Sequence, residues 1–228
     1  MRRNLDINVL LFNNRIYGLT KGQFSPTSEQ GKVTTSTPTG SIDPPLNPIG
    51  LALATGATFV ARSLDRDPRH LRSVLLEAAG HKGTSFIEIY QNCNIFNDGT
   101  FFAQTEKETK ADNVVFLTHG KPLVFGKNGD KGVRLNGFTP EIVALTEGES
   151  TVDDLIVHDQ YAADPTLASI LARMSDIPGM PHPIGVFRSV ERPCYEDLMA
   201  AQIQAAMEQR GDVDLQAVLS EGETWVVE

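Results

Sequence analysis

The 228-residue chain has little of three things: cysteine, basic charge and long apolar runs. Its two cysteines, Cys93 and Cys194, are too few for a disulfide framework or a self-sufficient metal site. With 20 Lys and Arg against 29 Asp and Glu, the net charge of −9 argues against nucleic-acid binding. No apolar run reaches the roughly 18–20 residues of a membrane span, and the stretch at 9–12 is too short for a secretory signal. We therefore expect a cytoplasmic protein that binds neither nucleic acid nor membrane.

The first 115 residues contain an alternation of apolar strands and amphipathic helices. Residues 8–12, 58–62 and 85–90 are short apolar runs typical of buried parallel strands. Residues 48–55 predict a short helix, and residues 67–80 predict a second one that begins with a capping Asp-Pro pair. This order of elements predicts an α/β fold with a parallel sheet.

Beyond residue 115 the pattern changes. Two apolar runs, 123–125 and 133–135, flank an Asn-Gly-Asp turn and predict a β-hairpin. A capped helix is expected after Asp164-Pro165, with a buried apolar face. The proline-rich residues 178–193 are interpreted as a connection to a last helix that ends at Gly211.

The end of the chain is acidic. Residues 191–228 hold nine acidic and two basic residues, so they carry −7 of the total charge of −9. We interpret them as a solvated acidic tail. The change of pattern near residue 115 divides the chain into two expected segments, 1–115 and 116–228.

The segment that most suggests chemistry is NNRIYGLTKGQFSPTS, residues 13–28, directly after the first predicted strand. Parallel sheets bind ligands at the carboxyl ends of their strands. The amide oxygen of Asn14 and the carbonyl of Ile16 are ligands that Mg²⁺ accepts beside phosphate. Gly18 permits close approach to a phosphate, and Thr20 adds a hydroxyl. On these residues alone, however, an Asn-Asn pair after a strand is more often a turn former.

Other residues are ambiguous when considered alone. A cysteine just past a buried strand, such as Cys93, is usually a small core residue. Lys21 would ordinarily be a solvated loop lysine. The five histidines have no HxH or HExxH spacing, so we assign no metal to them.

Three longer strings are more specific. NNRIYGLTKGQFSPTSEQGK at 13–32, YQNCNIFNDG at 90–99 and HGKPLVFG at 119–126 stand in this order along the chain. Together they resemble the β subunit of 2-oxoacid:ferredoxin oxidoreductases, in particular the two-subunit type that oxidises 2-oxoglutarate. The resemblance extends at least over residues 4–137.

The resemblance implies three cofactors: thiamine diphosphate, Mg²⁺ and a [4Fe–4S] cluster. Asn14 matches the side-chain Mg²⁺ ligand, and Ile16 matches the residue whose carbonyl binds the same ion. Leu19 and Thr20 match positions beside the diphosphate and the thiazolium ring. Lys21 matches a lysine that faces the 2-oxoacid, where its charge suits the second carboxylate of 2-oxoglutarate. Cys93 matches the last of the four cluster thiolates.

The sequence also departs from the family. The Gly-Asp-Gly element that supplies the acidic Mg²⁺ ligand has no counterpart, and neither do the other three cluster cysteines. Both belong upstream in the family, so both sites are incomplete in this chain. We therefore expect 1–115 to be the C-terminal part of a thiamine diphosphate-binding parallel-sheet domain. Residues 116–228 would add a β-hairpin extension and a helical, acidic C-terminal tail.

The implied function is part of an oxidoreductase that converts 2-oxoglutarate and coenzyme A to succinyl-CoA and CO₂ and reduces ferredoxin. An α subunit is the implied partner, and it supplies the catalytic glutamate, so no residue of this chain is a catalytic acid or base. Two alternatives stay open at this point. In the first, the chain is a non-catalytic remnant or assembly piece that binds an α subunit. In the second, it serves the same chemistry on pyruvate or a branched 2-oxoacid.

Overall fold

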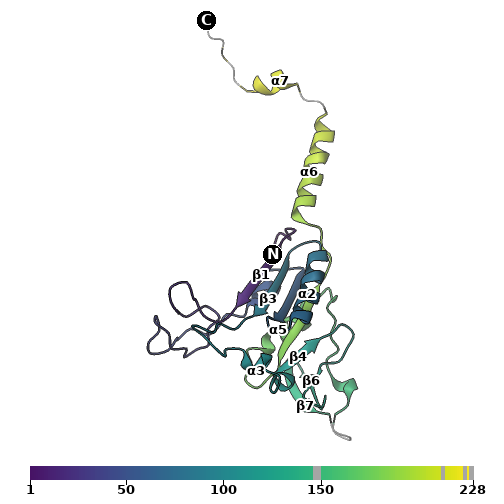
Figure 1. The fold of residues 1–228 in the computed structure, drawn as a ribbon. Helices are drawn as coiled ribbons and strands as arrows, with labels where there is room; N and C mark the ends of the chain where they lie inside the picture. The colour runs from purple at the N-terminus through teal and green to yellow at the C-terminus, as the bar shows by residue number, and fades with distance from the viewer. Residues whose placement is uncertain (146–149, 212–213, 223–224, 226–228) are drawn as a thin grey trace.

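A five-stranded sheet forms the centre of the structure (Figure 1). The structure is a computed structural model that describes residues 1–145, 150–211, 214–222 and 225. The strands of the sheet are β1 (Asn8–Asn13), β2 (Phe59–Leu64), β3 (Ser85–Tyr90), β4 (Val114–Leu117) and β8 (His182–Ser189). Their spatial order is β1-β3-β2-β8-β4. Strands β1, β3 and β2 are parallel, whereas β8 runs antiparallel to β2 and parallel to β4. The predicted α/β class and the three predicted parallel strands are confirmed, but the expectation that all three are buried is wrong for β1, an edge strand with Leu10 and Phe12 exposed.

Helices cover both faces of this sheet. On one face, α1 (Pro48–Ala54) and α5 (Thr166–Met174) enclose the largest core cluster with apolar side chains of all five strands. On the other face, α2 (Pro68–Gly80) packs Val74 and Ala78 against a second cluster. The side chains of Asn47 and Asp67 cap α1 and α2 by accepting hydrogen bonds from backbone N–H groups. The helices expected from the sequence therefore form where they were predicted.

The proline-rich connection predicted over 178–193 is wrong. Residues 182–189 form β8, which lies inside the sheet between β2 and β4. Proline is tolerated here because Pro183 precedes Gly185, where the pairing of β8 with β2 begins, so only the side toward β4 is paired at Pro183. The predicted division after residue 115 falls inside β4, and both segments contribute strands to the sheet.

A second, smaller sheet follows β4. It is antiparallel and consists of β5 (Val124–Phe125), β6 (Lys131–Asn136) and β7 (Thr139–Ala144). The predicted hairpin corresponds to β5 and β6, and β7 adds a third strand. Two short helices, α3 (Phe102–Thr105) and α4 (Lys110–Asn113), precede β4, and the 3-10 helix η1 (Val152–Asp154) follows β7.

The C-terminal helices leave the body of the protein. Helix α6 (Tyr195–Arg210) ends at Gly211 as predicted, and α7 (Leu215–Leu219) follows it. Figure 1 shows α6 extending away from the sheet with α7 beyond its far end. None of the α6 side chains is buried. The acidic tail expected over 191–228 therefore begins at the sheet and includes an exposed helix, although part of it lies outside the described residues.

Candidate cofactor-binding site

The turn directly after β1 holds the two predicted Mg²⁺ ligands close together. Asn14 is half-buried, and its side-chain oxygen accepts a hydrogen bond of 3.3 Å from the backbone N–H of Ile16. Arg15, between them, adopts the left-handed conformation with φ +54°. Within the described residues, no hydrogen bond ends on the carbonyl of Ile16. The turn at the carboxyl end of β1 therefore contains one side-chain amide oxygen, on Asn14, and one carbonyl, on Ile16, to which no described residue donates a hydrogen bond.

Asn13, which the sequence analysis did not single out, holds this turn in place. Its side-chain oxygen accepts hydrogen bonds from the Arg15 N–H at 3.1 Å and from the Thr27 hydroxyl at 2.7 Å. Its side-chain amide donates to Glu88 on β3 at 2.7 Å. The first Asn of the Asn-Asn pair thus couples the turn to the neighbouring strand. The Asn-Asn pair in the sequence was the signal that could have revealed this role. Only its second member, Asn14, matched a Mg²⁺ ligand.

Glu88 belongs to a charged network that crosses the sheet beneath the turn. It lies 2.7 Å from Nε of Arg62 on β2, and both side chains are almost completely buried. Arg62 also donates to the Ser175 hydroxyl at 2.6 Å and to the Pro183 carbonyl at 3.3 Å. The network therefore links the β1 turn to α5 and β8. A charged residue within an otherwise apolar strand was the available sequence signal.

Two neutral titratable groups border this network. Burial raises the pKa of Tyr90 to about 12. Burial, together with the positive charges of Arg62 and Arg15, lowers the pKa of His182 to about 3. The Tyr90 hydroxyl lies 3.0 Å from Nδ1 of His182. Near pH 7 both groups are neutral, so Arg62 and Glu88 supply the charge in this part of the site.

The predicted diphosphate and substrate positions lie farther along the loop. Backbone hydrogen bonds between Tyr17 and Gln23 close a small hairpin whose tip contains residues 18–21. Leu19 is 84% exposed, and Thr20 donates a hydrogen bond to the Gln23 side chain. Lys21 is exposed and left-handed, with φ +69°. The structure thus presents residues 18–21 together at one exposed tip.

The Cys93 loop packs directly against this hairpin. A Cβ built on Gly18 or Gly22 would lie 3.7 or 3.0 Å from the Phe96 ring. Asn97 donates hydrogen bonds to the carbonyls of Asn14 at 2.9 Å and Arg15 at 3.3 Å. The loops after β1 and β3 therefore form one unit that contains every predicted site residue.

The surroundings of Cys93 favour a thiolate. Its side chain is partly exposed, and no disulfide involves it. Partial burial opposes ionisation, but the backbone N–H groups of residues 95–97 outweigh it and lower the pKa of the Cys93 thiol. Cys194, by contrast, is buried at the start of α6 near the amino ends of the strands, and burial raises the pKa of its thiol. The surroundings of the two cysteines therefore differ, and only those of Cys93 favour loss of the thiol proton.

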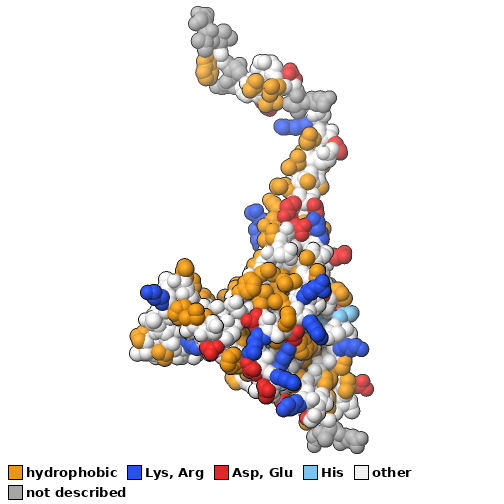
Figure 2. All heavy atoms as spheres, in the orientation of Figure 1, with side chains coloured by type: hydrophobic (Ala, Val, Ile, Leu, Met, Phe, Trp, Pro, Cys, Tyr) orange, Lys and Arg blue, Asp and Glu red, His pale blue; other side chains and the backbone are white. Residues whose placement is uncertain are grey.

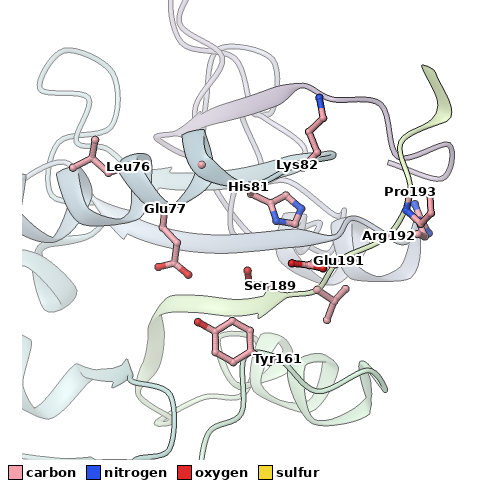
Figure 3. Close-up of a pocket in the computed structure, with 11 residues that line it drawn as sticks. Leu76, Glu77, His81, Lys82, Tyr161, Ser189, Glu191, Arg192 and Pro193 are labelled. Carbon is pink, nitrogen blue, oxygen red and sulfur yellow. The ribbon is translucent and has the colours of Figure 1, made fainter. Parts of the chain in front are cut away.

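Cavities lie at both ends of the sheet. One of about 280 Å³ adjoins the 13–16 turn and is lined mainly by apolar side chains. Another of about 710 Å³ follows the charged network from Asn13 to His182. A third, of about 840 Å³, lies at the opposite end, where Glu77 and His81 face Tyr161 and residues 189–193 (Figure 3). The third cavity contains none of the predicted site residues, so the candidate site lies at the carboxyl end.

Comparison with known proteins shows which family the chain resembles. The family described as "Thiamine pyrophosphate enzyme, C-terminal TPP binding domain" matches residues 1–89. The protein of Mycobacterium tuberculosis named 2-oxoglutarate oxidoreductase subunit KorB is 47% identical over the whole of this chain. The resemblance to 2-oxoacid:ferredoxin oxidoreductase β subunits is confirmed.

Other relatives of this family match over shorter stretches or at the level of fold. Subunit beta of 2-oxoacid:ferredoxin oxidoreductase 1 from Aeropyrum pernix is 47% identical over 97 residues, covering 42% of this chain and 30% of that protein. The solved 2-oxoglutarate:ferredoxin oxidoreductase from Magnetococcus marinus aligns with 98% of this chain at 24% identity and a TM-score of 0.68. This chain spans 61% of the mycobacterial relative and 60% of the solved chain.

The part of the chain that the structure describes contains neither a cluster of metal-binding side chains nor a helix suited to span a membrane. Among the described residues, no three His, Cys, Asp or Glu side chains gather in a way that could hold a metal ion. Across the same parts of the chain, no helix combines the length and apolar character that a bilayer crossing requires.

Proposed function

We propose that this chain is the thiamine diphosphate-binding portion of the β subunit of a cytoplasmic, heteromeric 2-oxoglutarate:ferredoxin oxidoreductase. The reaction converts 2-oxoglutarate and coenzyme A to succinyl-CoA and CO₂ and reduces ferredoxin. The observation that carries the proposal is the single unit formed by the loops after β1 and β3. It holds the Asn14 amide, the Ile16 carbonyl and the Cys93 thiol at the carboxyl end of a sheet whose family binds this cofactor. The partners are an α subunit and ferredoxin.

The β1 turn fits one side of a Mg²⁺-diphosphate. The Asn14 and Ile16 oxygens are hard ligands, and the hydrogen bonds of Asn13 and Asn14 hold the turn that carries both residues. When bound, thiamine diphosphate would supply an electron sink for decarboxylation. The part of this chain is to orient the diphosphate through the turn and to present residues 18–20 beside it. The remaining acidic ligand would come from the Gly-Asp-Gly element, which belongs upstream in the family.

Cys93 fits one corner of an iron–sulfur cluster. The N–H groups of residues 95–97 stabilise a thiolate, which is the form that binds iron. A [4Fe–4S] cluster requires four such ligands, so the other three would come from outside this chain. Lys21, exposed at the hairpin tip, would face the substrate and bind the second carboxylate of 2-oxoglutarate.

The first test is Asn14→Ala in the complete heteromer. We expect 2-oxoglutarate-dependent reduction of ferredoxin to fall by roughly 10–100-fold, because one Mg²⁺ ligand is lost. Asn128→Ala, on an exposed hairpin turn, is the matched control and should retain activity. Unchanged activity of the Asn14 variant would exclude the proposed Mg²⁺ site. If the unmodified heteromer neither turns over 2-oxoglutarate nor binds thiamine diphosphate, the result would support the non-catalytic alternative.

The two cysteines provide an internal comparison. Cys93→Ser should remove the broad visible absorption of the iron–sulfur cluster, whereas Cys194→Ser should retain it. Equal absorption in both variants would show that Cys93 is not a cluster ligand.

The substrate is tested with Lys21→Ala. Its turnover of 2-oxoglutarate should fall selectively relative to pyruvate, and Lys127→Ala on the exposed hairpin serves as control. If the Lys21 variant turned over 2-oxoglutarate as fast as the unmodified enzyme does, the result would favour pyruvate or a branched 2-oxoacid as the natural substrate.

A further inference from the structure

Helix α6 is an exposed helix with an uncharged centre. Residues 198–207 contain no charged side chain, and Met199, Ile203 and Met207 are 45%, 54% and 62% exposed. Figure 2 shows apolar side chains along the length of this helix. Helices of this length derive most of their stability from packing of an apolar face, which α6 does not find on its own chain.

The sequence of this centre is a palindrome. Residues 199–207 read MAAQIQAAM, which is the same in both directions about Ile203. At 3.6 residues per turn, residues three, four and seven positions from Ile203 share its face. That face consists of Glu196, Met199, Ala200, Ile203, Ala206, Met207 and Arg210. The face is symmetric in shape, and its two ends carry opposite charges.

This arrangement is complementary to itself in the antiparallel direction. A two-fold axis through Ile203 places Met199 against Met207 of a second copy. It also places Ala200 against Ala206 of the second copy, and these small side chains let the helices approach closely. At each end, Glu196 of one copy meets Arg210 of the other. A parallel pairing would instead set like charges opposite each other, so the charges select one direction.

We propose that α6 pairs antiparallel with α6 of a second copy of this chain. The base of α6 is anchored well enough to present the face. The Tyr195 N–H donates to the Asn4 carbonyl at 3.2 Å, and the Arg3 guanidinium lies 5.0 Å above the Tyr195 ring. Glu196 accepts a hydrogen bond of 3.0 Å from the Asp6 N–H, but its carboxylate has further acceptor capacity.

The opposite side of α6 does not have the same charge symmetry. Five positions from Ile203 in the two directions stand Leu198 and Glu208, an apolar and a charged residue that do not complement each other. Glu208 instead accepts a hydrogen bond from Gln204 at 2.9 Å within its own helix. The palindromic face is therefore the one suited to a second copy. This inference is independent of the proposed enzymatic function.

The first experiment compares two neighbouring alanines by sedimentation of the full chain. At about 100 µM, a concentration suited to the small interface of one helix pair, the unmodified chain should sediment as a dimer. Ala206→Glu, inside the face, should raise the dissociation constant at least about 100-fold, because it buries unpaired charge. Ala205→Glu, on the far side, adds the same charge to the same helix and should leave the dimer intact.

The second experiment exchanges the terminal charges. Arg210→Glu should weaken the dimer about tenfold, since both ion pairs become like-charge contacts. Adding Glu196→Arg to the same chain restores opposite charges at both ends and should restore the affinity. Only pairing between two identical helices predicts this rescue.

Three results would overturn the proposal. The first is that the unmodified chain sediments as a monomer at this concentration. The second is that its dimer survives Ala206→Glu, and the third is that the charge exchange fails to restore the dimer. If the chain is monomeric and Ala206→Glu instead abolishes co-purification of the α subunit, then α6 is a docking helix for that subunit.

Discussion

The two ends of the central sheet each contain an asparagine that joins segments distant in sequence. At the carboxyl end, Asn13 connects the β1 turn to the Glu88–Arg62 pair. At the amino end, Asn4 accepts hydrogen bonds from the Thr58 hydroxyl at 2.7 Å and the Thr84 N–H at 3.0 Å, and donates to the Arg192 carbonyl at 2.8 Å. The first network contains buried charge and the second does not.

This difference reflects what each end supports. The neutral network fixes the first residues of the chain to the link between β8 and α6. No predicted site residue lies at this end. The charged network lies beneath the candidate cofactor site. Removing one partner of a buried ion pair leaves the other charge buried and uncompensated, so the pair makes the site intolerant of partial change. We expect substitutions at the two ends to differ accordingly.

The largest effect is expected for Glu88→Ala. It leaves Arg62 buried without its carboxylate, which should lower the free energy of unfolding by about 3–5 kcal/mol in urea denaturation. Glu141→Ala breaks the pair with Arg134, in which the Arg134 and Glu141 side chains are 42% and 34% exposed, and should cost less than about 1 kcal/mol. Similar losses of unfolding free energy in both variants would mean that the buried pair matters no more for stability than the exposed pair.

At the amino end, Asn4→Ala should cost about 1–3 kcal/mol. The Thr84 N–H then lacks its buried acceptor, but no charge is left unpaired. Asn128→Ala on the exposed hairpin is the control and should change stability by less than about 0.5 kcal/mol. If Asn4→Ala were as damaging as Glu88→Ala, the contrast between charged and neutral networks would be lost.

The carboxyl end should also respond to acid through His182. Its pKa is about 3 in the folded chain against an ordinary 6.5, so the unfolded chain takes up a proton that the folded chain refuses. Stability is therefore unaffected above pH 6.5 and declines as the pH falls from 6.5 toward 3. Between pH 6.5 and 5 the loss should be about 1–2 kcal/mol.

His182→Gln tests this by flattening the dependence of unfolding free energy on pH over that interval. The slope that remains belongs to buried histidines elsewhere, since burial also lowers the pKa values of His70, His81 and His158. Asn128→Ala, at an exposed position without a titratable group, is the control and should leave the slope unchanged. Equal slopes for the His182 variant and the unmodified chain would contradict the assignment.

The smallest effect concerns the left-handed turn at the site. Arg15 has φ +54°, a conformation that glycine adopts without steric cost. Arg15→Gly and Arg15→Ala both remove the ion pair with Glu29, but only glycine relieves the backbone strain. The glycine variant should therefore be more stable than the alanine variant by about 0.5–1 kcal/mol in the same denaturation assay. The reverse order would show that the turn is not strained.

The sequence predicted what depends on local pattern. The strands over 58–62 and 85–90 were recognisable because both of their faces are buried and mostly apolar, whereas the edge strand over 8–12 was recognisable from its apolar run alone, since Leu10 and Phe12 are exposed. β8 was missed because its place in the sheet depends on pairing with β2 and β4, which no local pattern encodes, and because Pro183 suggested a connection.

The same limit applies to the site. The closeness of Asn14 and Ile16 follows from two-residue spacing in a turn and was predictable. The pairing of Arg62 with Glu88 joins residues on different strands, so it is visible only in the folded chain. The role of Asn13 was hidden for the same reason, since its partners Thr27 and Glu88 are distant in sequence.

The interior position of β8 has a consequence for synthesis of the chain on the ribosome. Between Leu64, the end of β2, and His182, the start of β8, lie 117 residues. At roughly 5–20 residues per second, their translation takes about 6–23 s. During this interval the edge of β2 that will receive β8 has no native partner, and apolar side chains that β8 will cover stay accessible. A chaperone that shields nascent chains should therefore raise the yield of folded protein most when it acts before residue 189 has emerged.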